Sequence, residues 1–88
     1  MRASITGARS GTARVRDLAI GGAFLETAQH FAAGDSMHVE ILSGSQPFAS
    51  DAIVRNVTPS GIGIEFVEMK TEERELLRLL ITELLGNF

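Results

Sequence analysis

The sequence has no cysteine and only two histidines among its 88 residues. It can therefore form no disulfide framework, and a structural zinc site, which needs several Cys or His ligands, is not expected. No apolar run approaches the roughly 20 residues of a membrane-spanning helix, and the first residues lack the apolar core of a signal peptide. These absences predict a soluble, cytoplasmic protein. A chain of this length cannot fill a second hydrophobic core, so we expect one domain spanning residues 1–88.

Charge is distributed unevenly along the chain, although the net charge is only -3. Residues 1–16 hold arginines and no acid, whereas residues 65–83 are rich in glutamate. The N-terminal part therefore favours anions. Its arginines have too few aromatic residues among them to predict a track for a nucleic-acid polymer. They form either an anion site or solubilising charges on exposed strands.

Alternation of apolar and polar residues predicts strands over most of the chain. Residues 37–41 and 62–66 alternate as half-buried strands do, because successive side chains of a strand point to opposite faces. The turn residues Thr58, Pro59, Ser60 and Gly61 predict a hairpin between the last two strands. No long helix separates the strands, so an antiparallel barrel or sandwich is favoured. The expected strands are residues 2–6, 12–18, 23–27, 36–42, 52–57 and 62–68.

The C-terminal segment changes to a helical period. Thr71 is the expected N-cap, glutamates follow in the first turn, where the helix dipole favours anions, and Gly86 is the expected stop. The helix should therefore run from about residue 72 to 85.

The apolar residues of this helix cover a wider arc than one contact with a barrel needs. Leu79 and Leu85 fall at opposite edges of that arc. They either pack on the chain itself or form an exposed apolar strip that binds a protein partner or a second copy of the chain. The residues expected to close the barrel are Leu76, Leu80, Ile81 and Leu84.

The most informative stretch is RDLAIGGAFL, residues 16–25, where a strand ends in an acid, the chain turns through two glycines and an apolar strand resumes. Six antiparallel strands with this seam and a final helix resemble the PilZ family of bacterial signalling domains. The family's seam motif is Asp or Asn, any residue, Ser, any two residues and Gly. Here Asp17 and Gly22 match it, and Ala19 stands in place of the serine. GIGIEF, residues 61–66, resembles the family's last strand.

The resemblance implies a mainly β fold, a six-stranded antiparallel β-barrel with a C-terminal α-helix, and cyclic di-GMP as the ligand. In the family, two arginines with three residues between them, just before the first strand, hold the phosphates and guanines of this ligand. No such pair precedes the first strand here, where Arg2 follows only Met1. We expect either a degenerate member that has lost the pair or a member whose sequence begins after it.

Residues at the seam have a chemistry that suits a guanine nucleotide. The Asp17 carboxylate can accept hydrogen bonds from the N1–H and amino group of guanine. Gly21 and Gly22 are expected to adopt positive φ and to let a flat ligand approach the backbone. Ala19 removes a hydroxyl worth about 0.5–1.5 kcal/mol, whereas each missing arginine removes a contact of about 1.5–3 kcal/mol. The expected ligand-binding residues are Arg2, Arg14, Arg16, Asp17, Ala19, Gly21 and Gly22.

Two alternatives stay open for the arginines at the seam and for the function. Arg14 and Arg16 either replace the missing pair in part or are solvated and paired across strands. The domain is either a cyclic di-GMP receptor that reports to a partner protein or an attached domain, or a ligand-independent adaptor that acts through its Leu-rich helix. We favour a signalling domain of the cyclic di-GMP pathway with weakened direct binding. His30 and His38 are expected to be surface residues, because neither has a partner at a spacing typical of catalysis, so no enzyme is predicted.

Overall fold

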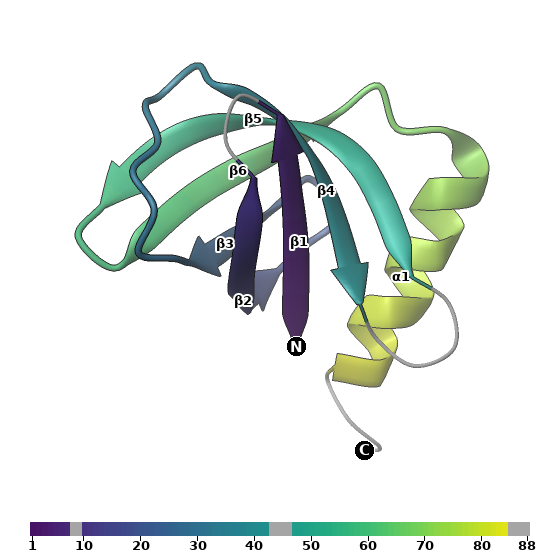
Figure 1. Cartoon of the computed structure of the whole chain (residues 1–88). Helices are drawn as coiled ribbons and strands as arrows, with labels where there is room; N and C mark the ends of the chain where they lie inside the picture. Colours follow the sequence, from purple (N-terminus) through teal and green to yellow (C-terminus); the bar gives the residue numbers. More distant parts are fainter. Residues whose placement is uncertain (8–9, 43–46, 85–88) are drawn as a thin grey trace.

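The computed structural model of the chain describes residues 1–7, 10–42 and 47–84, and it consists of a closed antiparallel barrel with one helix beside it (Figure 1). Neighbouring strands around the barrel follow the order β1-β2-β3-β6-β5-β4, and β4 pairs with β1 to close it. The predicted fold class is confirmed. The elements are β1 (Arg2–Gly7), β2 (Gly11–Leu18), β3 (Gly22–Glu26), β4 (Ser36–Leu42), β5 (Phe48–Thr58), β6 (Gly61–Val67) and α1 (Thr71–Leu84).

The hydrophobic core fills the barrel with alternate side chains from the strands. In β4, for example, Met37, Val39 and Ile41 are buried, whereas the residues between them face outward. Two aromatic rings from β5 and β6, those of Phe48 and Phe66, meet edge to face with centroids 5.3 Å apart. The outward-facing residues of the strands are therefore free to form a surface site.

Strand β5 differs from its prediction, because it begins at Phe48 and not at residue 52. The side chains that point into the barrel from β5 are those of Phe48, Ser50, Ala52 and Val54. The inward and outward alternation therefore begins at Phe48, four residues before the predicted start of the strand. The alternation of apolar and polar residues is interrupted in the sequence at Ser50, because this buried residue is polar. It is only 3% exposed, and its hydroxyl donates to the backbone carbonyl of Asp51 over 2.9 Å.

Two strands contain an irregularity in their pairing. The register of β2 against β3 shifts between Val15 and Asp17, and that of β5 against β6 shifts between Val54 and Asn56. Bulges of this kind insert one unpaired residue and bend the strand. In this barrel the inserted residues are Arg16 and Arg55, and both are exposed.

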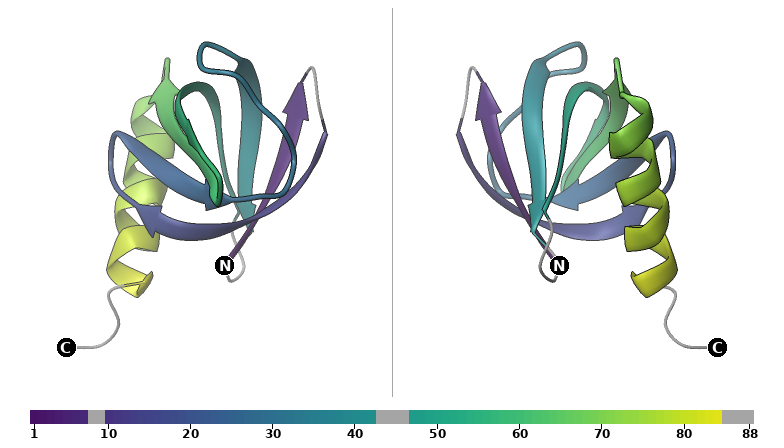
Figure 2. Two further views of the ribbon diagram at one scale, coloured as in Figure 1. Left: turned by 90° about the vertical axis from the view of Figure 1, so that its left-hand side faces the viewer. Right: turned by 90° about the vertical axis from the view of Figure 1, so that its right-hand side faces the viewer.

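Helix α1 lies beside the barrel and packs against β5 (Figure 2). The carbonyl of Lys70 accepts a hydrogen bond from the amide of Arg74 over 3.0 Å, which places Lys70 at the N-cap. The prediction that Thr71 caps the helix is therefore wrong, because Thr71 is its first helical residue.

Among the residues described, no helix is long and apolar enough to span a membrane. Gly86, the expected stop, lies outside those residues.

The contact of α1 with the core centres on Leu77 and Leu80, which are both buried. Leu76 and Ile81 are only partly buried against the same core. The predicted set of barrel-closing residues is therefore corrected, since it omitted Leu77, and the side chain of Leu84 lies outside the description. The apolar arc is narrower than the sequence suggested.

Candidate functional site

The seam between β2 and β3 is a tight turn. Asp17 is the second-last residue of β2, and the backbones of Ala19 and Gly22 exchange hydrogen bonds of 2.9 and 3.3 Å around Ile20 and Gly21. Neither glycine of the seam adopts a positive φ, so that prediction is wrong. Gly22 has a different role, because a Cβ at this position would overlap the carbonyl oxygen of Ile64 in β6.

Arg16, Asp17 and Phe24 form one connected group at this seam. The Nε of Arg16 lies 3.0 Å from Oδ2 of Asp17, and its guanidinium lies 4.0 Å from the centre of the Phe24 ring. Asp17 and Phe24 stand directly opposite each other in the β2–β3 pairing. The carboxylate remains 69% exposed and the arginine side chain 50% exposed. The guanidinium is thus oriented over the sheet while both charged groups stay accessible to a ligand.

A depression of about 420 Å³ lies over the turn and brings several predicted site residues together. Asp17, Ala19, Gly21 and Gly22 line it, and the Phe24 ring that Arg16 covers forms another part of its wall. Ala19 offers a methyl group at the position where the family has a hydroxyl. The depression therefore has a carboxylate and backbone groups, but no side-chain hydroxyl at that motif position.

Arg2 and Arg14 lie in a neighbouring depression of about 430 Å³ that does not include the seam residues. They stand directly opposite each other on β1 and β2, where like charges repel. Glu26 offsets this only in part, since its Oε1 lies 3.7 Å from Nε of Arg14. An anion could bridge the two arginines here.

The start of β1 is tied to the end of β2 by a backbone hydrogen bond. The amide of Val15 donates to the carbonyl of Met1 over 2.8 Å. The place just before the first strand, where the family has its arginine pair, thus lies near the seam. Arg74 and Arg78 also have three residues between them, but both are on α1, so the spacing occurs in this chain away from the family's position. Arg78 lies 3.8 Å from Glu75 of the same helix.

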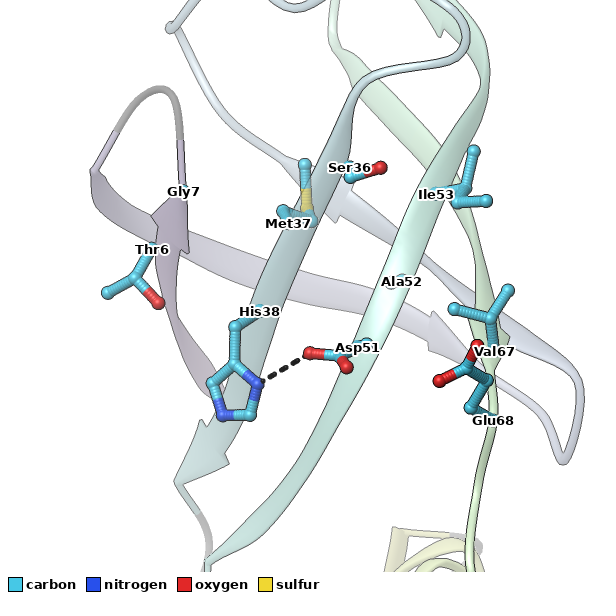
Figure 3. Close-up of a pocket in the computed structure, with 10 residues that line it drawn as sticks. All are labelled: Thr6, Gly7, Ser36, Met37, His38, Asp51, Ala52, Ile53, Val67 and Glu68. Atoms are coloured by element: carbon cyan, nitrogen blue, oxygen red, sulfur yellow. Dashed lines mark hydrogen bonds and ion pairs between the residues drawn. The ribbon is translucent and has the colours of Figure 1, made fainter.

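A third depression, of about 520 Å³, lies on the outer wall of the barrel, and no motif in the sequence pointed to it. Figure 3 shows His38 and Asp51 pointing toward each other there, and Nδ1 of the imidazole lies 3.0 Å from Oδ1 of the carboxylate. The two residues stand opposite each other on β4 and β5. Only the register of two strands reveals this pair. Within the described part of the chain, no group of three His, Cys, Asp or Glu residues is placed to hold a metal ion.

Comparison with known proteins agrees with this geometry. The family model of the PilZ domain matches residues 3–83, which is nearly the whole chain. No curated protein matches the chain. The matched segment covers β1 from Ala3 onward, the other five strands, the Asp17–Gly22 seam and almost all of the helix. The chain therefore belongs to the PilZ domain family.

Proposed function

We propose that this PilZ domain transmits a cyclic di-GMP signal through contacts with a partner protein or an attached domain, and that it binds the nucleotide itself only weakly. As a PilZ domain, the chain is a signalling domain of the cyclic di-GMP pathway. Weak direct binding is the finer part of this proposal. It is supported by the exposed Asp17 carboxylate beside Arg16, in a seam where Ala19 replaces the motif serine.

Weak binding follows from the side chains that the seam provides for the nucleotide and from those that it lacks. Asp17 can accept the N1–H and amino group of a guanine, and Arg16 can stack on a base face. The absent hydroxyl at Ala19 costs about 0.5–1.5 kcal/mol. An arginine pair in the family position would add about 1.5–3 kcal/mol for each residue. Its absence from the 88 residues therefore outweighs the loss of the hydroxyl.

Because Arg2, and not Arg16, stands directly opposite Arg14, we propose Arg2 and Arg14 in place of Arg14 and Arg16 as the partial replacement for this pair. Their cross-strand position forces two like charges together, and a bridging phosphate would relieve that repulsion. Arg14 must give up its contact with Glu26 to bind a phosphate fully. The replacement is therefore weaker than a dedicated pair.

Isothermal titration of the chain with cyclic di-GMP tests this proposal. We expect a dissociation constant no tighter than the micromolar range. A nanomolar constant would contradict the proposal and would mean that Arg2, Arg14 or Arg16 supplies the full phosphate contacts.

A ligand-independent adaptor is the second candidate function, and one observation favours it. Leu79 on α1 is 61% exposed, although Leu77 and Leu80 of the same helix are buried. In this candidate function, Leu79 contacts a protein partner or a second copy of the chain. Leu85, the other residue predicted for this strip, lies outside the described residues.

We also propose a cytoplasmic location for this domain and a role in binding without catalysis. The proposal does not include a nucleic-acid polymer as partner, because the arginines of residues 1–16 are not interleaved with aromatic residues.

A further inference from the structure

The depression around His38 and Asp51 shares no lining residue with the depression over the seam. Its volume is about 520 Å³. Ile53 of β5 and Val67 of β6, which are both half-buried, form an apolar part of its lining (Figure 3). A ligand bound here would therefore meet an apolar surface next to a polar pair.

The polar pair presents hydrogen-bond acceptors to this depression. An ionised carboxylate can only accept, so Nδ1 of His38, which lies 3.0 Å from Oδ1 of Asp51, is the donor of their hydrogen bond. A neutral imidazole that donates from Nδ1 has its lone pair at Nε2, and it does not cancel the charge of the carboxylate. The side chains of His38 and Asp51 are 51% and 63% exposed, so these acceptors are accessible.

Glu68 adds a second carboxylate to the same depression. Val67, the residue before it, stands opposite Asp51 in the β5–β6 pairing. In a continuing strand, the side chain after Val67 would point into the barrel as that of Phe66 does, because successive side chains alternate. Glu68 instead follows the end of β6 with a φ of 54°, and this exposed residue lines the outer depression.

A smaller depression, of about 280 Å³, continues the larger one toward α1. The two share His38, Asp51 and Glu68, and the smaller one adds Lys70 and the half-buried Glu73 at the start of the helix. We call the two depressions together the β5 groove. Three carboxylates in its lining stand against one ammonium group, so the groove favours a cation.

We propose that the β5 groove binds an arginine side chain of a partner protein. A guanidinium has five donors in a planar fork and no acceptor, which suits Nε2 of His38 and the carboxylates of Asp51 and Glu68. The aliphatic stem of an arginine is apolar and can pack on Ile53 and Val67. A lysine has a similar stem, but its compact head lacks the planar fork that reaches two acceptors at once, so arginine is favoured.

This inference rests on the proposed function and deepens it, since it gives the surface and the chemistry through which the domain contacts its partner. The β5 groove and the seam depression share no lining residue, so a nucleotide and a partner can be bound together. Strand β6 contributes to both, because Ile64 lines the seam depression and Val67 lines the groove.

An NMR titration followed through the backbone amides tests the inference without any nucleotide. The probe is the amide of Nα-acetyl-arginine, added to tens of millimolar. The matched control is the same derivative of citrulline, which keeps the shape of arginine but has no charge. We expect the amides of His38, Asp51 and Glu68 to shift with the arginine probe along one saturating curve, with a dissociation constant in the millimolar range that a ligand of this size can reach.

The citrulline probe should leave these amides unchanged, and the corresponding lysine derivative should bind more weakly than the arginine probe. Equal binding of either control probe, shifts of equal size at Glu75 on the far side of α1, or an absence of saturation would each overturn the inference.

Substitution of the carboxylates provides a second test. Asp51→Asn should weaken binding of the arginine probe about tenfold, the loss of one charge-assisted contact. Glu68→Gln should weaken it in the same direction, and both residues are exposed, so the fold should persist. Glu75→Gln is the matched control, because Glu75 is 59% exposed and lies near a basic side chain, that of Arg78, outside the groove. Equal affinities of the three variants would overturn the assignment.

These outcomes separate the inference from the proposed function. If the arginine probe does not bind, the inference is wrong, whereas weak cyclic di-GMP binding at the seam and partner contact through another surface still stand. A nanomolar constant for cyclic di-GMP would contradict the proposed weak binding and leave the β5 groove unaffected.

Discussion

Gly22 and Ile64 approach each other so closely that a side chain at residue 22 would force the backbones of β3 and β6 to move apart here. A Cβ on Gly22 would overlap the carbonyl oxygen of Ile64, whereas a Cβ on Gly21 would meet no heavy atom within 4 Å. Ile64 belongs to the pairing partner of Gly22's strand, and its carbonyl is fixed by the sheet. The second glycine of the seam is therefore required by packing.

Gly22→Ala should consequently destabilise the domain, whereas Gly21→Ala should not. Because backbone atoms must move to admit the methyl group, we expect a loss of about 1–3 kcal/mol in the free energy of unfolding. Urea denaturation of the two variants measures the difference, and Gly21→Ala serves as the matched control one residue away. Similar midpoints for both variants would show that the approach of β6 does not limit this position.

The core contact of α1 leads to a second prediction. Leu77→Ala and Leu80→Ala each remove a buried side chain, and each should cost about 2–5 kcal/mol. Leu79→Ala on the same helix should change the stability by less than about 0.5 kcal/mol, because this side chain is largely exposed. Thermal melts followed by circular dichroism would compare the three variants. A large loss for Leu79→Ala would place that residue in the core.

The number of strands could be predicted from the sequence because alternation is a local property, whereas alternation left a barrel and a sandwich open and the resemblance to the PilZ family favoured the barrel. Val39 and Ile41 are two residues apart and face the same way, so a short window shows the strand. The start of β5 was missed since Ser50 stands in an inward position, where a buried hydroxyl satisfied by the Asp51 carbonyl replaces an apolar group. The bulges at Arg16 and Arg55 could not be predicted, because a bulge is defined by the pairing of two strands and a short window of sequence shows only one of them.

The seam could be located for the same local reason, since Asp17 and Gly22 are close in the chain. The positive φ expected of Gly22 was wrong, and the close approach of β6 to this glycine could not be predicted, because β6 is distant in sequence. The contact of Arg16 with Phe24 and that of His38 with Asp51 also need the register of neighbouring strands. Local chemistry identified the candidate residues, but not the groups that orient them.

Asp17→Asn separates binding from stability at the seam. The ion pair of Asp17 with Arg16 is exposed, so its loss should change the free energy of unfolding by only about 0–1 kcal/mol. The variant should nonetheless bind cyclic di-GMP more weakly, because an amide offers one acceptor oxygen where the carboxylate offers two. Asp51→Asn is the matched control, as its carboxylate is similarly exposed and paired with a histidine. Melting curves and NMR titrations of both variants provide the measurement, and equal affinities would remove Asp17 from the site.

Leu79→Glu tests whether α1 contacts a partner or a second copy. Leu79 is 61% exposed, so a glutamate there should leave the fold intact, and a charge that must be desolvated in an interface should weaken association. Leu42→Glu is the matched control, because Leu42 is 47% exposed and lies on β4. Sedimentation over a range of concentrations would compare self-association of the wild-type chain and both variants, and would show whether only the Leu79 change affects it. A pull-down with the attached or partner domain would test hetero-association. If Leu79→Glu melts the domain, Leu79 is a core residue; if it changes neither association nor stability relative to Leu42→Glu, the adaptor function through this helix is wrong.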